Sequence, residues 1–191
     1  MQLPPSPRVV VIGSSCAGKS TFARALAHAR GCAHIELDEL FWSAHWQPRP
    51  AAEFRSLVAT SAGAGSWVAD GNYSSARDLL WPRATTVVWL NVSLPRALWR
   101  GLWRTLDRCV NRRDLWHGNR ESLRRAFLSK DSLLLWIATT YHRRRREFAQ
   151  LRASPDFGHL TWLEARNPRQ AEAVLLTLQQ QGGQHVATSP G

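Results

Sequence analysis

A glycine-rich stretch near the N-terminus has the residue types and the spacing that bind phosphate. The stretch reads Gly13, Ser14, Ser15, Cys16, Ala17, Gly18, Lys19, Ser20 and Thr21, and it matches the pattern G-x-x-x-x-G-K-[ST] in full. In such a loop, backbone N–H groups can point at phosphate oxygens, and the N-terminus of a following helix adds positive potential. Gly13 and Gly18 permit backbone angles and close approaches that a Cβ atom would block. The stretch therefore predicts a binding site for nucleotide phosphates, and we call it the phosphate loop.

Two side chains of the phosphate loop indicate the nucleotide and its metal ion. Lys19 can reach the β- and γ-phosphates of ATP, and the Ser20 hydroxyl can ligate Mg²⁺. A chance match in a turn rich in glycine and serine is the alternative. The flanks argue against it, because residues 8–12 form an apolar run typical of a buried strand and residues 21–27 read as a helix. Cys16 is interpreted as a small spacer rather than as a nucleophile.

Two aspartates follow predicted strands and can complete the chemistry of the loop. Asp70 ends the strand predicted over residues 66–69, where a carboxylate can hold water on Mg²⁺; the alternative is a turn aspartate before Gly71. Asp38 follows the strand predicted over residues 33–37, and a carboxylate there can orient or deprotonate an acceptor hydroxyl; the alternative is a cap for the next turn. Because parallel strands end at one edge of a sheet, both aspartates are expected beside the phosphate loop.

Arginines recur at every fourth position after the fourth predicted strand. Arg96, Arg100, Arg104 and Arg108 form one slanting stripe if this segment is a helix. Phosphoryl transfer needs cations that neutralise the transferring group and close over it, so we expect at least two arginines of this region to contact phosphate. The alternative is a solvated helix face. The basic run over residues 143–146 is interpreted as solvated surface, because successive helical residues point about 100° apart and cannot all face one ligand.

Strands and helices alternate along the chain and would position these residues. Apolar runs predict strands over residues 8–12, 33–37, 66–69, 85–92 and 159–163. Helices, with their capping residues, are expected over residues 21–27, 51–61, 74–80, 93–110, 121–128, 131–151 and 167–180. This alternation argues for a three-layer α/β fold with a parallel sheet between helices. Residues 1–7 and 182–191 read as flexible tails of a single domain over residues 1–191.

The composition is that of a globular protein and excludes several classes. The 191 residues are 44% hydrophobic and 20% charged, and no apolar run reaches the ~18 residues that span a bilayer. The N-terminal residues lack the apolar core of a secretory signal. Three scattered cysteines, Cys16, Cys32 and Cys109, indicate neither a disulfide framework nor a zinc site. We therefore expect a cytoplasmic protein.

The formal net charge of +11 indicates an anionic partner. Nearly all of the positive charge comes from arginine, since Lys19 and Lys130 are the only lysines in the sequence. So strong a preference for arginine, beside abundant alanine and tryptophan, partly reflects genomic base composition. The charge thus favours an anionic ligand such as ATP, and nucleic acid is kept as a partner that is not favoured. No membrane partner is expected. We expect the protein to be a monomer or a homodimer.

Together these motifs resemble the adenylate-kinase-like P-loop proteins of bacteria, in particular the "DNA topology modulation" group. The resemblance rests on the phosphate loop, on Leu37 to Trp42, on Trp67 to Tyr73 and on the arginine-rich segment after the fourth strand. It implies a kinase-like fold with a five-stranded sheet ordered 2-3-1-4-5 and a lid that carries arginines. Asp70-Gly71 is similar to the Asp-Gly of nucleoside monophosphate kinases, but Asn72-Tyr73-Ser74 stands where those kinases carry Phe-Pro-Arg.

The resemblance and the residues together predict an ATP-dependent phosphotransferase. We expect Lys19, Asp38, Arg104 and Arg120 to be catalytic, and Arg100 to bind the nucleotide beside the phosphate loop. The acceptor is expected to meet Asp38, Phe41, Trp42, Asp70, Gly71, Asn72 and Tyr73. Residues 110–129, polar and rich in arginine, are predicted to form the lid. Two alternatives stay open: a nucleotide-binding regulatory protein that binds DNA and transfers no phosphate, and simple ATP hydrolysis.

Overall fold

The computed structural model describes residues 7–63, 65–110 and 133–183, and within them five strands form one parallel sheet. The strands are β1 (Arg8–Gly13), β2 (Ala33–Glu36), β3 (Trp67–Asp70), β4 (Thr86–Leu90) and β5 (Thr161–Ala165). Their order across the sheet is β2-β3-β1-β4-β5, and every neighbouring pair is parallel. The predicted three-layer α/β fold and the predicted strand order are both confirmed.

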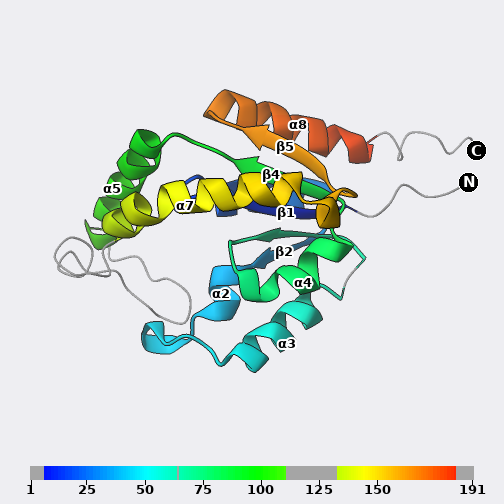
Figure 1. Cartoon of the computed structure of the whole chain (residues 1–191), viewed down its shortest axis with the longest axis horizontal. Helices are drawn as coiled ribbons and strands as arrows, with labels where there is room; N and C mark the ends of the chain where they lie inside the picture. The colour runs from blue at the N-terminus through cyan, green and yellow to red at the C-terminus, as the bar shows by residue number, and fades with distance from the viewer. Residues whose placement is uncertain (1–6, 64, 111–132, 184–191) are drawn as a thin grey trace, which may run out of the picture.

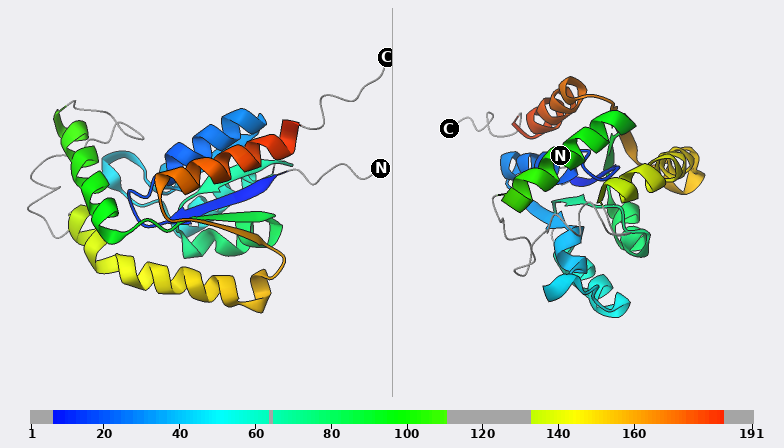
Figure 2. Two further views of the ribbon diagram at one scale, coloured as in Figure 1. Left: turned by 90° about the horizontal axis from the view of Figure 1, so that it is seen from above. Right: turned by 90° about the vertical axis from the view of Figure 1, so that its left-hand side faces the viewer.

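Helices cover both faces of the sheet (Figure 1). One face carries α1 (Lys19–Arg30), α8 (Pro168–Gly183) and the first turns of α5 (Leu94–Val110). Helices α1 and α8 lie side by side there, in blue and red in the left view of Figure 2. The other face carries α3 (Ala51–Ser61), α4 (Arg77–Leu80) and α7 (Leu133–Ala153), while the short α2 (Leu37–Phe41) continues directly from β2. Short 3-10 turns lie at Ala44–Trp46, Ser74–Ala76, Trp81–Arg83 and Pro155–Phe157.

The central strand β1 shows why the strands read as continuous apolar runs. Side chains alternate between the two faces of a strand, so Val9 and Val11 join the core under α1 and α8, whereas Val10 and Ile12 join the core under α3 and α7. All of these side chains are at most 2% exposed. A strand that is covered on both faces is apolar at every position, as expected for a parallel sheet.

Several predicted boundaries differ from the structure. The strand predicted over residues 33–37 ends at Glu36, because Leu37 begins a short helix over residues 37–41 that the sequence did not predict. Strand β5 begins two residues later than the run at 159–163 predicts, because His159 and Leu160 belong to the preceding turn. Helix α8 reaches Gly183, so the start of the predicted C-terminal tail is helical. The N-terminal tail was predicted to include Pro7, whose carbonyl oxygen instead accepts a hydrogen bond from the Trp67 N–H.

The last helix begins as the sequence predicts. The predicted cap of the last helix is present, because the Asn167 side chain accepts a hydrogen bond from the Gln170 N–H at 2.9 Å. The predicted helix at 121–128 and nearly all of the predicted lid at 110–129 lie outside the described residues. In the part of the chain that the structure does describe, no helix is long and apolar enough to cross a bilayer.

Gly71, in the turn after β3, packs closely against Leu37, and its substitution tests this packing. Gly71 has φ of +143°, and a Cβ atom there would lie 2.8 Å from Cβ of Leu37. Gly31 also has positive φ, +58°, but has open space around it. We predict that Gly71→Ala lowers the free energy of unfolding by about 3 kcal/mol, from backbone strain and overpacking together, and that the control Gly31→Ala lowers it by about 1 kcal/mol. Urea denaturation measures both, and equal losses would contradict the packing described.

Candidate active site

The phosphate loop joins β1 to α1 at the carboxyl edge of the sheet. Gly13 has φ of +150°, and a Cβ atom there would lie 2.5 Å from the backbone oxygen of Leu90 on β4. Gly18 has φ of +99° and precedes the first residue of α1, whose hydrogen bonds begin with Phe22 N–H to the Gly18 oxygen. The two glycines are thus required for different reasons: Gly13 because β4 is too close, and Gly18 because the chain turns into the helix there.

Lys19 folds back over this loop. Its amine donates to the backbone oxygens of Gly13 at 3.2 Å and Ser14 at 3.1 Å. Burial lowers the pKa of Lys19, while the negative charges of Asp38 and Asp70 oppose that shift. A phosphate oxygen carries full negative charge and is a stronger acceptor than a peptide carbonyl, so the amine is placed to exchange these partners for phosphate.

Asp70, the last residue of β3, meets Ser20 from the first turn of α1. The Ser20 hydroxyl donates to Oδ2 of Asp70 at 2.6 Å, and the aspartate is only 3% exposed. A hydroxyl and a carboxylate are the oxygen ligands that Mg²⁺ takes, usually one or two from the protein with phosphates and waters completing the shell. The described residues hold no group of three or more His, Cys, Asp or Glu side chains suited to a metal ion. The pair therefore fits Mg²⁺ bound together with nucleotide phosphates.

Asp38 lies in α2 and pairs with Tyr73, which follows β3. The Tyr73 hydroxyl donates to Oδ1 of Asp38 at 2.7 Å. Burial, and then the negative charge of Asp38, raises the pKa of Tyr73, so the phenol keeps its proton and remains a donor. The ring of Phe41 lies 4.7 Å from that of Tyr73 and 4.9 Å from that of Trp42. The structure thus gathers these predicted acceptor residues into one half-buried group of a carboxylate, a phenol and apolar rings.

The remaining predicted acceptor residues hold the phosphate loop in place. The Asn72 amide donates to the Gly13 oxygen at 2.6 Å, and its side-chain oxygen accepts from the Gly13 N–H at 3.4 Å. The Gly71 N–H donates to the Val11 oxygen at 3.3 Å. The side chain of Asn72 therefore points at the phosphate loop, and its contact with the acceptor stays a prediction.

Two of the predicted arginines lie beside the loop. Arg100 donates from Nη1 to the Ala17 oxygen at 3.0 Å. Arg104, one turn further along α5, adds its positive charge to the effects that lower the pKa of Lys19, and its buried Nε has no hydrogen-bond partner within the described residues. Arg120 lies outside the described residues, as does the side chain of Arg108. Arg96 is exposed at the start of the stripe.

Sequence reasoning missed two polar residues of this site. His34 on β2 has Nε2 at 2.8 Å from Oδ1 of Asp70 on the neighbouring strand. Arg144 on α7 is half-buried and donates to the backbone oxygen of Asn72 at 3.0 Å. A histidine within a short strand, beside the apolar Ile35, was the available signal for the first residue. No local signal distinguishes Arg144 from the three arginines around it, because its role depends on which face of α7 meets the sheet.

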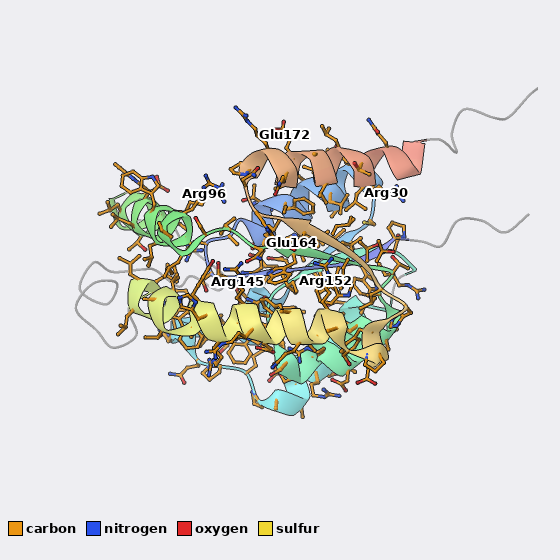
Figure 3. All side chains as sticks on the ribbon, turned by 45° about the horizontal axis from the view of Figure 1, so that its top comes forward. Arg30, Arg96, Arg145, Arg152, Glu164 and Glu172 are labelled. Atoms are coloured by element: carbon orange, nitrogen blue, oxygen red, sulfur yellow. The ribbon has the colours of Figure 1, made fainter. Side chains whose placement is uncertain are left out.

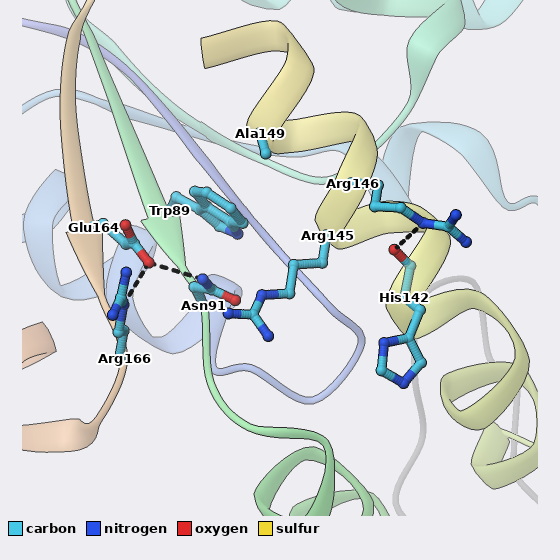
Figure 4. Close-up of a pocket in the computed structure, with 8 residues that line it drawn as sticks. All are labelled: Trp89, Asn91, His142, Arg145, Arg146, Ala149, Glu164 and Arg166. Carbon is cyan, nitrogen blue, oxygen red and sulfur yellow. Dashed lines mark hydrogen bonds and ion pairs between the residues drawn. The ribbon is translucent and has the colours of Figure 1, made fainter. Parts of the chain in front are cut away.

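A hollow of about 640 Å³ opens between α7 and the ends of β4 and β5 (Figure 4). Its lining residues are Trp89, Asn91, His142, Arg145, Arg146, Ala149, Glu164 and Arg166. Glu164 accepts from Asn91 at 2.8 Å and from Arg166 at 2.7 Å, and the bond from Arg166 is the main cause that lowers the pKa of Glu164. Arg152 of α7 also reaches Glu164, across the space between β5 and α7 seen in Figure 3. Arg145 and Arg146 of the basic run thus line this hollow, while Arg144 and Arg145 both line a smaller pocket beside Ser14 of the phosphate loop.

No family model and no curated protein sequence matches the chain, whereas solved structures match it over most of its length. A shikimate kinase from Acinetobacter baumannii, in complex with shikimate, aligns with a TM-score of 0.54 at 15% identity, over 95% of this chain and 96% of that one. A shikimate kinase from Bacteroides thetaiotaomicron gives 0.52 at 18% identity, over 92% and 97%. A gluconokinase from Sinorhizobium meliloti 1021 gives 0.50 at 20% identity, over 93% and 95%. At these identities the likeness defines the fold, which is that of the P-loop kinases.

The contact between α5 and the phosphate loop generates a prediction. Arg100 donates to the loop, whereas Arg96 lies one turn earlier on the same helix and is exposed. We predict that Arg100→Ala weakens ATP binding at least about tenfold, because a charge-assisted hydrogen bond contributes about 1.5–3 kcal/mol, and that the control Arg96→Ala stays within about twofold of the parent protein. Isothermal titration with ATP and Mg²⁺ measures both, and equal effects of the two changes would remove Arg100 from the nucleotide site.

Proposed function

We propose that this protein is an ATP-dependent phosphotransferase with an acceptor hydroxyl on a small molecule or a nucleotide. The observation that carries the proposal is the meeting of Ser20 and Asp70, 2.6 Å apart, beside a phosphate loop whose half-buried Lys19 donates to backbone carbonyl oxygens. Residues 13–21 would hold the ATP phosphates, and Ser20 and Asp70 would hold Mg²⁺. Bound Mg²⁺ would offset charge on the β- and γ-phosphates.

The acceptor is assigned to the group around Asp38. In the transfer, the acceptor oxygen forms a bond to the γ-phosphorus, the bond from that phosphorus to the β–γ bridging oxygen breaks, and ADP leaves. The Asp38 carboxylate orients the acceptor hydroxyl and takes its proton. Tyr73 holds that carboxylate through its hydrogen bond of 2.7 Å, and the rings of Phe41 and Trp42 offer an apolar wall.

Cations around the loop supply the remaining electrostatics. Arg100 lies against the loop and Arg104 lies close enough to influence Lys19. Guanidinium groups in this position stabilise charge on the transferring group without giving up a proton. Arg120 and nearly all of the lid predicted over residues 110–129 lie outside the described residues, so the proposal rests on Arg100 and Arg104. From the resemblance to the "DNA topology modulation" group, the proposal uses only the kinase-like fold that the resemblance implies. The proposal includes no role in DNA binding.

The proposal is tested by following the label of γ-³²P-ATP. The protein is incubated with Mg²⁺ and pools of hydroxylated acids, sugars, nucleosides and nucleotides, and labelled organic product is separated from inorganic phosphate. We expect labelled product that depends on one pool. Release of inorganic phosphate alone, at a rate that no pool changes, would establish hydrolysis instead, and absence of any ATP consumption would overturn both activities.

A substitution of Asp38 distinguishes an effect on phosphoryl transfer from an effect on nucleotide binding. We predict that Asp38→Asn lowers kcat for the acceptor at least ~100-fold, since general-base assistance typically contributes that much or more, while the dissociation constant of ATP changes less than about twofold because the phosphate loop is untouched. Glu39→Gln, an exposed neighbour on the same short helix, serves as the control and should retain the parent kcat. Equal losses of ATP binding and of turnover in Asp38→Asn would show that Asp38 only supports the fold.

A further inference from the structure

One contact of the site has no part in the function proposed above. His34, on β2, places Nε2 at 2.8 Å from Oδ1 of Asp70, the carboxylate oxygen that Ser20 leaves free. The side chain of Asp70 is 3% exposed and that of His34 is 18% exposed. Asp70 is thus held from both sides, by a hydroxyl from α1 and by an imidazole from β2.

The hydrogen bond from His34 is energetically important because the carboxylate that accepts it is buried. An ionised carboxylate removed from water is strongly destabilised unless its oxygens receive hydrogen bonds. Within the described residues, Oδ1 of Asp70 has the His34 ring as its side-chain partner. The imidazole donates in this pair, because an ionised carboxylate only accepts, so Nε2 carries the proton. Donation to Oδ1 also fixes the rotation of the carboxyl group, which leaves Oδ2 facing Ser20 and the phosphate loop.

The contact is not required to join the two strands. Strand β2 already pairs with β3 through backbone hydrogen bonds, in register from Ala33 opposite Trp67 to Glu36 opposite Asp70. Replacing the imidazole by an apolar group would therefore leave the strand pairing intact and remove only the donor to Asp70. Partners of this kind, which bind a metal ligand and not the metal, orient the ligand and typically change metal affinity 10- to 100-fold.

We propose that His34 is a positioning residue that orients the Asp70 carboxylate for Mg²⁺. The inference rests on the proposed function, since it takes Ser20 and Asp70 as the ligands of Mg²⁺, and it adds the residue that sets how well Mg²⁺ binds there. If His34 has this role, its replacement changes how strongly Mg²⁺ tightens the binding of ATP. A purely structural histidine would instead affect stability and the binding of all ligands alike.

The experiment measures the dissociation constant of ATP with EDTA and with Mg²⁺, and divides the metal-free constant by the Mg²⁺ constant, so that a larger ratio means a stronger effect of Mg²⁺. We expect His34→Leu to lower this ratio about tenfold while metal-free ATP affinity stays within about twofold. His34→Gln, whose amide nitrogen can take the place of Nε2, should restore the ratio to within about threefold of the parent protein. His28→Leu, which removes an exposed histidine of α1, is the matched control and should leave the ratio unchanged.

Each outcome of this experiment supports or contradicts the role proposed for His34. If His34→Leu does not fold, His34→Asn takes its place, since its shorter amide cannot reach Asp70, and it should behave as described for leucine. A parent protein in which Mg²⁺ tightens ATP binding, but whose ratio His34→Leu and His34→Asn leave unchanged, would overturn this inference and spare the proposed function. A parent protein whose ATP binding ignores Mg²⁺ would overturn both.

Discussion

The burial of β1 between two parallel neighbours is the constraint on which the site depends. Its backbone pairs with β3 on one side and β4 on the other, and its side chains are buried on both faces. Parallel strands cannot be joined by hairpins, so the chain crosses over through helices and every strand ends at the same edge. The ends of β1, β3 and β2 therefore deliver the phosphate loop, Asp70 and Asp38 to one place. The site is a consequence of the sheet, and the loop alone would not assemble it.

The loop in turn keeps its shape because its neighbours surround it. The closeness of β4 requires glycine at position 13, Asn72 binds both backbone groups of that glycine, and Arg100 holds the Ala17 oxygen. These contacts position the loop before any ligand arrives, so little reorganisation accompanies binding. Asn72, which the sequence predicts to meet the acceptor, thus also supports the phosphate loop.

Local patterns predicted the fold and the loop, because each depends on residues close together in sequence. Apolar runs revealed β1 and β4, and the glycine spacing fixed the turn between β1 and α1. The contact between His34 and Asp70 escaped prediction because it depends on which strands are neighbours and on their register. Arg144 escaped because four successive arginines look alike until α7 is seated on the sheet. The resemblance to a family supplied the strand order, which no local pattern contains.

The measurement that tests the account most directly is ATP binding and turnover in Lys19→Ala, with folding checked by circular dichroism. Lys19 lies half-buried over the loop, and its partners there are backbone oxygens that ATP phosphates would replace. The parent protein should gain about 2.7 kcal/mol of stability at an ATP–Mg²⁺ concentration 100 times the dissociation constant. We predict that folded Lys19→Ala loses most of this stabilisation at the same concentration and nearly all turnover. A folded variant that binds and consumes ATP within a few-fold of the parent protein would contradict the account.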